Sequence, residues 1–570
     1  PPPPPPPPAA APPPPPVAAR RAEHRPAPVS APDPSPGKRR LQADVTAGDR
    51  LVTSAFVAGT VHHVDVSVGR QAAIHAGEAF PAVAMPEDVD RIRLTVRFAA
   101  HGTVQEGTIL LPRDESRESS AASFELHVPP GARQVSALVV VYLGTEVLQG
   151  AVLSGPVVAT LADEAGFAGA ITLDVGAFVK DLVPASTSAA TASVVADAST
   201  AVASSPGGTV AIDVSALRDE VADLAERIDG GAELLFQGDE AEVERLFRDL
   251  ALHGRRLRSV VAEQLGADLC AATHLQVVTL SAGAFLPLEL VYDGPQPTSR
   301  SKLCRQWREA AQAGTCTACS PKPRMRSPRV CPSHFWGLSK VIERHAGLGG
   351  RAGAFEVRSE RREGVMALPP LVGAVVGASG KVEPDDLAAV VTVARRTFRR
   401  ARKASSWREW TSLVREAEPG VLVALPHHEE DASVDPALSC LELGTSLLPA
   451  GGIELRYVGE RRPGPVVLLV GCNTALDRTP IDSFAGEFRA AGASVVVATL
   501  GPVIPEEAAR AAEAVVRALG DATRAAGAAT TFGEVMLQAR RALVGEGLVL
   551  GLLLVANGDA DWRLGVTADG

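Results

Sequence analysis

This sequence has few cysteines, few lysines, no excess of positive charge and no long apolar run. Seven cysteines among 570 residues are too few for a disulfide scaffold. A net charge of −10 gives no reason to expect a nucleic-acid partner. The longest apolar run, Leu548 to Ala556, is shorter than a membrane span, and no charged-then-apolar leader occurs. Arginine far outnumbers lysine, as in GC-rich genomes. With neither a membrane span nor a secretory signal in this sequence, we expect a protein of the bacterial cytoplasm without a membrane partner.

Aromatic residues are also scarce, at 4% of the chain, whereas 46% of it is hydrophobic. The cores should therefore be built from alanine, valine and leucine. Because 570 residues exceed what one core usually holds, we expect several folded units. Residues 1–44 are dominated by proline and cannot build a core, so they are predicted to be a disordered Pro-rich tail.

Two segments with different patterns follow the tail. Residues 45–158 contain alternating runs such as RIRLTVRF and SFELHV, separated by turn signals such as PPGA. This pattern predicts an all-β, sandwich-like domain. Residues 159–208 are predicted to be a linker, because STSAATASVVADASTAVASSPGG at 186–208 is small, polar and almost uncharged.

The remaining residues indicate an α/β architecture. Residues 209–365 begin with two amphipathic helices, continue with the apolar strand LQVVTL, and carry a Cys-rich insert at 300–335. From 366 to 570, apolar strand runs alternate with helices. Such alternation predicts a mostly parallel sheet with helices on both faces. Active groups in these folds gather where the strands end, at their carboxyl ends.

Two strand ends in residues 366–570 carry reactive side chains. VLVALP ends in His427-His428, and PVVLLV ends in Gly471-Cys472. A thiol needs a neighbouring base to ionise near neutral pH, so the two strand ends could form a nucleophile and its base. On the residues alone, the alternatives are a small core cysteine and a solvated histidine pair.

Several segments, taken in order, resemble the CHAT domains of bacterial caspase-like cysteine peptidases, which are related to caspases, separases and gingipains. The resemblance covers about residues 210 to 566. It is carried by the following segments: LPLELVYD (286–293), LVALPHH (422–428), VVLLVGCNTA (466–475), FAGEFRAAGASVVVATLGPV (484–503), TTFGEVMLQARRALV (530–544) and LLLVANGDADWRL (552–564). It implies an α/β caspase-like sheet, with a non-catalytic first half at 209–365 and a catalytic half at 366–570.

The resemblance also assigns residue roles. Cys472 would be the nucleophile and His427 its base, with His428 as the runner-up. His428 departs from the commoner pattern, which has glycine or a small residue at this position. The backbone around Gly471, Cys472 and His428 would stabilise the oxyanion, and one such donor contributes about 3 kcal/mol.

The implied activity is that of a cysteine endopeptidase acting on a protein or peptide substrate, without a cofactor for catalysis. Asp477 and Asp482 could favour a basic residue before the cut bond, or could instead cap the helix that starts near Phe484. The β-domain would dock a regulatory protein partner, in bacterial defence or cell death. The rival hypotheses are an inactive scaffold of the same fold and a nucleotide-binding module at GASGK (377–381), which lacks the full P-loop spacing.

The Cys-rich insert carries a second candidate site. Its four cysteines follow the pattern C-x11-C-x2-C-x11-C, at Cys304, Cys316, Cys319 and Cys331. Four thiolates can close a tetrahedron around structural zinc, and the insert has no core of its own. The alternatives are a reduced loop without a metal and a disulfide, and His334 and His345 could serve as spare ligands.

Overall fold

The computed structural model describes most of the chain outside the Pro-rich start. The described residues are 38–70, 72–77, 79–81, 83, 85, 87–178, 191–197, 199–235, 240–280, 284–319, 328–346, 367–368, 371–430, 439–471, 484–524 and 530–564. The predicted tail lies largely outside these residues. Its predicted end at residue 44 is wrong, because the first strand already begins at Arg40.

Two mostly antiparallel sheets make up the first folded unit, residues 40–178. The first has the order β2-β1-β4-β8 with β5 beside β1, and the second has the order β11-β10-β9-β6-β7 with β3 beside β10. Their buried valine, leucine and phenylalanine side chains share one core. The unit therefore extends about twenty residues past the predicted boundary at residue 158.

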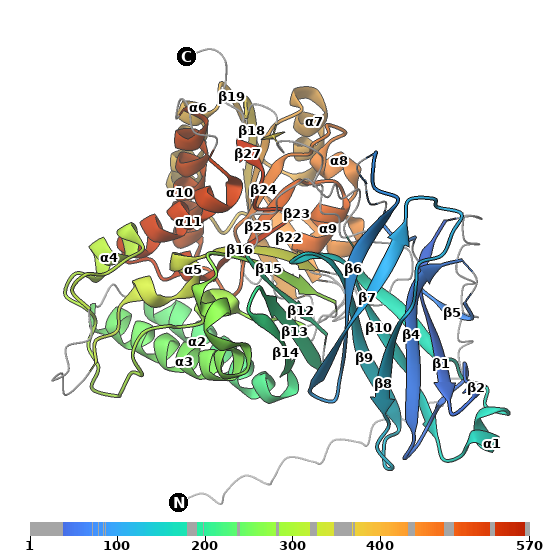
Figure 1. Ribbon diagram of the computed structural model, residues 1–570. Helices are drawn as coiled ribbons and strands as arrows, with labels where there is room; N and C mark the ends of the chain where they lie inside the picture. The colour runs from blue at the N-terminus through green and yellow to red at the C-terminus, as the bar shows by residue number, and fades with distance from the viewer. Residues whose placement is uncertain are drawn as a thin grey trace, which may run out of the picture.

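The elements of this unit, in chain order, are β1 (Arg40–Ala47), β2 (Arg50–Leu51), β3 (Phe56–Val57), β4 (Val61–Gly69), β5 (Ile74–His75), β6 (Arg91–Ala100), β7 (Thr103–Pro112), β8 (Ala122–His127), β9 (Gln134–Leu143), β10 (Glu146–Val158), α1 (Leu161–Glu164) and β11 (Thr172–Phe178). Strand β8 shows why the pattern folds this way, since its residues alternate strictly between buried and exposed. Figure 1 shows the unit in blue to teal, to one side of the rest of the molecule.

The predicted linker is wrong over residues 192–208, where the chain forms strands. Strands β12 (Ala192–Ala196) and β13 (Thr200–Ser205) are buried at every residue, and β14 (Gly208–Asp213) pairs with β13. Val194 and Ala203 face a core with helix α3, while Val195 and Val202 face the outer side of the β6–β9–β10 sheet. A strand covered on both faces can be built from small uncharged residues, which is also the composition of a linker.

Strands β12 to β14 belong to a second sheet with the order β14-β13-β12-β15-β16. In this sheet β12, β15 (His274–Thr279) and β16 (Val341–Ala346) run parallel. The two predicted amphipathic helices are α2 (Arg218–Leu235) and α3 (Glu240–Ala271), and α3 packs on β13 and β14. The short elements around them are η1 (Ser215–Leu217), η3 (Leu288–Leu290), α4 (Trp307–Ala313), η4 (Pro332–His334) and α5 (Trp336–Ser339).

The third sheet has the order β19-β18-β20-β24-β25-β26, with only β26 antiparallel to its neighbour. Figure 1 shows α6, α10 and α11 on one side of it and α7, α8 and α9 on the other. The predicted α/β sheet with helices is therefore confirmed. Its strands are β18 (Gly373–Ala378), β19 (Arg400–Ala404), β20 (Val421–Leu425), β24 (Val466–Leu469), β25 (Val495–Thr499) and β26 (Leu554–Asn557).

The other elements of this unit are β17 (Ala367–Leu368), α6 (Pro384–Thr397), α7 (Trp407–Ala417), β21 (His427–Glu430), β22 (Ser439–Leu443), β23 (Ser446–Pro449), η5 (Ala450–Gly452), α8 (Leu455–Val458), α9 (Phe484–Ala490), α10 (Pro505–Arg524), α11 (Phe532–Gly545), α12 (Leu550–Leu553) and β27 (Arg563–Leu564). Strands β21, β22 and β23 form a small separate sheet, and β17 pairs with β27. No helix within the described ranges is both long and apolar enough to cross a bilayer.

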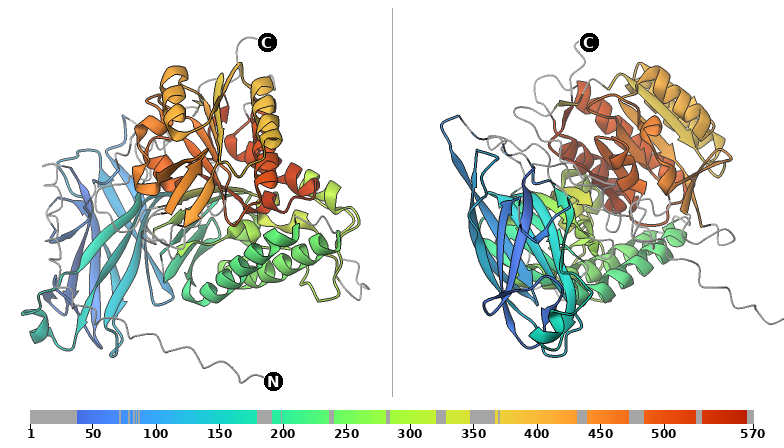
Figure 2. Two further views of the ribbon diagram at one scale, coloured as in Figure 1. Left: turned by 180° about the vertical axis from the view of Figure 1, so that it is seen from behind. Right: turned by 90° about the vertical axis from the view of Figure 1, so that its right-hand side faces the viewer.

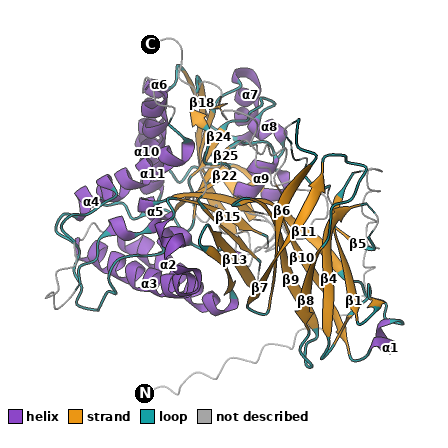
Figure 3. Ribbon diagram, viewed as in Figure 1, coloured by secondary structure: helices purple, strands orange, loops and turns teal. Residues whose placement is uncertain are grey.

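The second and third sheets meet edge to edge at β16 and β26. The amide of Gly558 donates a hydrogen bond to the carbonyl of Arg344, at 2.8 Å. Gly558 has a φ of +124°, and a Cβ there would lie 2.6 Å from the carbonyl oxygen of Ser494, so the position requires glycine. Figure 3 shows strands β13 and β15 of the second sheet below strands β18, β24 and β25 of the third, and Figure 2 shows the molecule from two other sides. The two halves are therefore one continuous α/β body.

Candidate functional site

The strands that precede the predicted nucleophile and base are neighbours. Strand β20 pairs in parallel with β24, with Ala424 opposite Leu469. The pairing continues past the end of β24, because the amide of Val470 donates to the carbonyl of Ala424 at 3.0 Å. Adjacent strands lie about 4.8 Å apart, so the two chain segments leave the same edge of the sheet side by side.

Gly471 explains how closely the two exits approach each other. A Cβ on this residue would lie 2.4 Å from the carbonyl oxygen of Pro426, far closer than real contacts allow. The carbonyl of Gly471 also accepts a hydrogen bond from the hydroxyl of Thr499, at the end of β25. Glycine is therefore required at this position by its close approach to the backbone of Pro426.

His427 follows Pro426 directly and is half-buried at the start of β21. The backbone of His428 lies in the same strand, but its side chain is outside the described residues. Cys472, Asp477 and Asp482 also lie outside them. The structure therefore brings Gly471 and His427 to one edge, while the pairing of the thiol with the imidazole stays a prediction.

The β21–β23 sheet stands against the carboxyl edge of the main sheet. The amide of Gly444, in the turn between β22 and β23, donates to the carbonyl of Ala378 at 2.8 Å, just where β18 ends. The amide of Ser379 donates to the carbonyl of Leu425 at 2.9 Å. These bonds fix β18, β20 and the hairpin relative to one another around His427. The edge is thus held by backbone hydrogen bonds rather than by side chains alone.

Sequence reasoning missed Glu442, which lies directly opposite His427 in the β21–β22 pair. Cross-strand partners project from the same face with Cβ atoms about 5 Å apart. Among the described residues, Oε2 of Glu442 is buried without a hydrogen-bond partner. Only the pairing register could have revealed it, because Glu442 lies fifteen residues after His427 across the segment 431–438.

The glutamate of the LPLELVYD segment belongs to a buried ion pair rather than to the strand edge. Glu289 is fully buried and accepts from Nε of Arg344 at 2.9 Å, and Nη2 of Arg540 lies 3.8 Å from its Oε1. Burial alone would raise the pKa of Glu289, but the charges of both arginines hold it below its ordinary value. Because Arg344 is in β16 and Arg540 is in α11, this contact joins the two halves.

A second buried network lies beside the same junction. Nε2 of His345 lies 2.7 Å from Oε1 of Glu343, and the amide of Ala560 donates to Oε2 of Glu343 at 2.9 Å. Asp559, of the closing Gly-Asp pair, is fully buried within reach of His345. The idea that His345 is a spare ligand for the cysteines is therefore wrong, because β16 directs it into this carboxylate network.

Comparisons with known proteins give only distant likenesses. No family model matches the chain, and no curated protein does. The arginine-specific cysteine proteinase gingipain R is 12% identical over 60% of this chain and 70% of that chain, with a TM-score of 0.30. The complex of the pro- and mature domains of RgpB from Porphyromonas gingivalis is 12% identical over 61% and 77%, also with a TM-score of 0.30. The Saccharomyces cerevisiae separase–securin complex is 8% identical over 66% and 30%, with a TM-score of 0.34.

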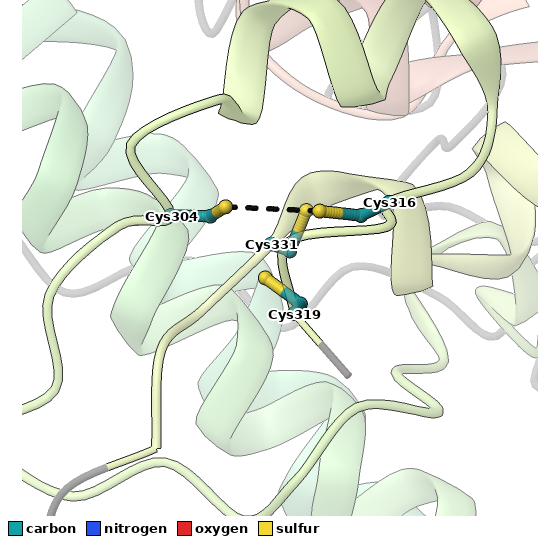
Figure 4. A group of neighbouring side chains, drawn as sticks. All are labelled: Cys304, Cys316, Cys319 and Cys331. Carbon is teal, nitrogen blue, oxygen red and sulfur yellow. Dashed lines mark hydrogen bonds between the residues drawn. The ribbon is translucent and has the colours of Figure 1, made fainter. Parts of the chain in front are cut away.

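The four cysteines of the insert come together in space (Figure 4). Their Sγ atoms all lie within 4.8 Å of one another, and those of Cys304 and Cys316 are 3.7 Å apart. Cys304 and Cys331 are buried, and the other two are partly buried. Three separate segments contribute them: one before α4, one after it, and one at the start of η4. The structure therefore confirms that the cysteines cluster, and the metal stays a prediction.

Burial and contact with one another shift the pKa values of three of these thiols. Burial raises the pKa of Cys331 to about 12, and burial together with contact with Cys304 raises that of Cys319. Burial would also raise the pKa of Cys316, but hydrogen bonds from Cys319 and Cys304 lower it. Without a cation, the thiols of Cys319 and Cys331 therefore stay protonated near neutral pH.

Proposed function

We propose that this chain is a caspase-like cysteine endopeptidase of the CHAT type, with Cys472 as nucleophile and His427 as general base. The observation that supports this most directly is the contact between Gly471 and Pro426 at the end of two adjacent parallel strands. The residue after Gly471 is the cysteine, and the residue after Pro426 is the histidine. In the sequence, the proposed nucleophile and base therefore each directly follow a residue of this sheet edge.

The strand order also supports a site at this edge. Numbered along the chain, the main sheet has the order 2-1-3-4-5-6, and the order reverses between β18 and β20. In open α/β sheets, ligands bind outside the carboxyl ends of the strands near such a reversal. His427 follows β20, one of the two strands that flank it. The proposed base thus stands where this class of fold places its active groups.

The proposed chemistry is acyl transfer. The thiolate of Cys472 attacks the carbonyl carbon of a peptide bond, and the backbone amides of Cys472 and His428 donate to the oxygen that becomes negative. The His427 imidazolium, formed by taking the thiol proton, gives that proton to the departing amine. A water molecule, deprotonated by His427, then hydrolyses the thioester and restores the thiol. No cofactor takes part in these steps.

We assign Glu442 the role of a positioning residue. Its place opposite His427 in the hairpin would let its carboxylate, directly or through a water molecule, orient the imidazole. The substrate would be a protein or peptide, and Asp477 and Asp482 would favour a basic residue before the cut bond. The β-domain would dock a regulatory partner while fixed to the second sheet, β12 to β16, through the core that Val140, Val202 and Leu280 share.

The test compares cleavage and thiol labelling in matched variants. Wild-type protein should cleave members of a peptide library, and Cys472→Ala should cleave none of them. His427→Ala should lower kcat/KM at least about 100-fold, because general acid–base catalysis typically contributes that much. His428→Ala tests the runner-up and should keep activity if His427 is the base. His127→Ala, which removes an exposed histidine at the end of β8, is the control for losing a histidine.

Labelling with iodoacetamide gives a readout that does not require the right substrate. Cys472 should react faster than Cys270 near neutral pH, and His427→Ala should remove that advantage. Glu442→Gln should shift the pH profile of labelling without abolishing it. Equal labelling in wild type and in His427→Ala, with both proteins folded, would contradict the dyad and favour a non-catalytic scaffold.

A further inference from the structure

We propose that Cys304, Cys316, Cys319 and Cys331 bind one zinc ion that fastens the insert of residues 300–335 to the rest of the α/β body. This site is independent of the proposed peptidase chemistry, because the four cysteines belong to the first half and none lies at the strand edge of β20 and β24. The ion would be structural, since the protein fills all four positions.

The sulfur positions fit a tetrahedral metal. Zinc–sulfur bonds are about 2.3 Å long, so the edges of a ZnS₄ tetrahedron are about 3.8 Å. The Sγ atoms of Cys304 and Cys316 are 3.7 Å apart, and no pair among the four exceeds 4.8 Å. Figure 4 shows the side chains converging from different segments on a common centre. A small inward movement of the wider pairs completes the coordination.

The alternative of a disulfide fits these positions less well. A disulfide needs sulfurs about 2.05 Å apart, and no disulfide links these four cysteines. One disulfide would also leave two thiols facing it, whereas a single divalent ion uses all four. Tetrahedral sulfur sites select zinc or iron, and among redox-inactive metals zinc is the usual occupant.

Backbone hydrogen bonds hold the two chain arms that carry the buried cysteines. The amide of Cys304 donates to the carbonyl of Val330 at 2.8 Å, and the amide of Val330 donates to the carbonyl of Lys302 at 3.0 Å. The amide of Cys331 donates to the hydroxyl of Tyr292 at 3.1 Å. These bonds fix the ligand backbones before a metal binds, which lowers the cost of ordering them.

Helix α4, which lies between Cys304 and Cys316 in the chain, shows what the ion would hold together. Its Trp307 packs against Phe247 of α3, with ring centroids 5.5 Å apart. At its other end Gly314 has a φ of +69° and lies against the guanidinium of Arg541 in α11. The ion would therefore anchor a helix that contacts both α3 of the first half and α11 of the catalytic half.

The experiment measures metal bound to the full chain. The protein is purified without added metal and desalted. Inductively coupled plasma mass spectrometry should then find one zinc ion per chain. Cys304→Ser and Cys319→Ser should lose that zinc, while Cys270→Ser, which removes a thiol outside the cluster, should keep it. Adding zinc chloride to chelator-stripped protein should raise its melting temperature, and magnesium chloride should not.

A second measurement uses wild-type protein, so it does not depend on whether the cysteine variants fold. In native wild-type protein, these four cysteines should resist N-ethylmaleimide until a zinc chelator is added, and then react together, as peptide mapping of the labelled protein would show. Three results would overturn the proposal: a metal-free chain whose four thiols react at once, disulfides among them under reducing purification, or iron in place of zinc.

Discussion

Replacing Glu289 with glutamine should destabilise the α/β body strongly, although the side chain keeps its size. The carboxylate lies between Arg344 and Arg540, whose side chains are only 4% and 1% exposed. Glutamine would leave both guanidinium groups buried without a counter-charge from this position. Breaking a buried ion pair by removing one partner costs about 3–5 kcal/mol.

The expected change in melting temperature follows from the size of the folding unit. Unfolding entropy is about 2.1 cal/mol/K per residue. The α/β body, residues 191–564, has about 370 residues, so each kcal/mol shifts the melting temperature by about 1.3 °C. We therefore expect the melting temperature of Glu289→Gln to be about 4–6 °C lower than that of wild type. The fluorescence of the buried Trp336 and Trp562 would report the unfolding.

The matched control is Glu416→Gln, which removes a carboxylate from an exposed pair. Glu416 and Arg402 are 3.1 Å apart, and both side chains are 52% exposed. Exposed pairs contribute about 0–1 kcal/mol, so the control should melt within about 1 °C of wild type. If Glu289→Gln and Glu416→Gln have the same melting temperature at neutral pH, the buried charge of Glu289 does not hold the two halves together.

The same variant has a predicted pH dependence. The pKa of Glu289 is lower in the folded protein than the ordinary value of about 4.3 that it takes in the unfolded chain. Its contribution to stability is therefore fully present above that ordinary value, and is lost as the pH falls through the folded pKa. The difference in melting temperature between wild type and Glu289→Gln should accordingly be constant near neutral pH and shrink in acid.

Two further predictions test the strand edge and the β-domain interface. Gly471→Ala places a Cβ 2.4 Å from the carbonyl oxygen of Pro426, so it should lower the free energy of unfolding by about 1–3 kcal/mol. It should also displace the proposed active edge and reduce peptide cleavage. Gly451→Ala, whose Cβ has open space around it, should change neither stability nor cleavage. Leu280→Ala should lower the free energy of unfolding in urea by about 2–5 kcal/mol, because Leu280 is 3% exposed between the β-sandwich and the second sheet, β12 to β16. Leu447→Ala, at a side chain that is 50% exposed, should change it by no more than about 0.5 kcal/mol. Equal stability of the two members of either pair would contradict the packing described here.

Local patterns in the sequence were enough to predict several elements. The amphipathic spacing predicted α2 and α3, and the apolar runs VLVALP and PVVLLV predicted β20 and β24. These predictions succeed because period and composition are set by which face of an element is buried. The clustering of four cysteines followed from the CxxC spacing in a segment without a core of its own.

Other features depended on partners far away in the chain. The Ala- and Ser-rich residues 192–205 looked like a linker, and only the covering of both faces, by α3 and by the β-sandwich, makes them a buried sheet. The pairing of Glu289 with Arg344 and Arg540 joins positions up to 251 residues apart. No local pattern carries such information.

The sequence by itself determined many of the strands and helices of the α/β region, such as α2, α3, β20 and β24, because their patterns depend on neighbours within a few residues. The tertiary structure decided that β20 and β24 lie side by side, that Gly471 touches Pro426, and that Glu442 faces His427. Strand order and register arise from contacts between distant segments, and these contacts become favourable only when the whole sheet is assembled.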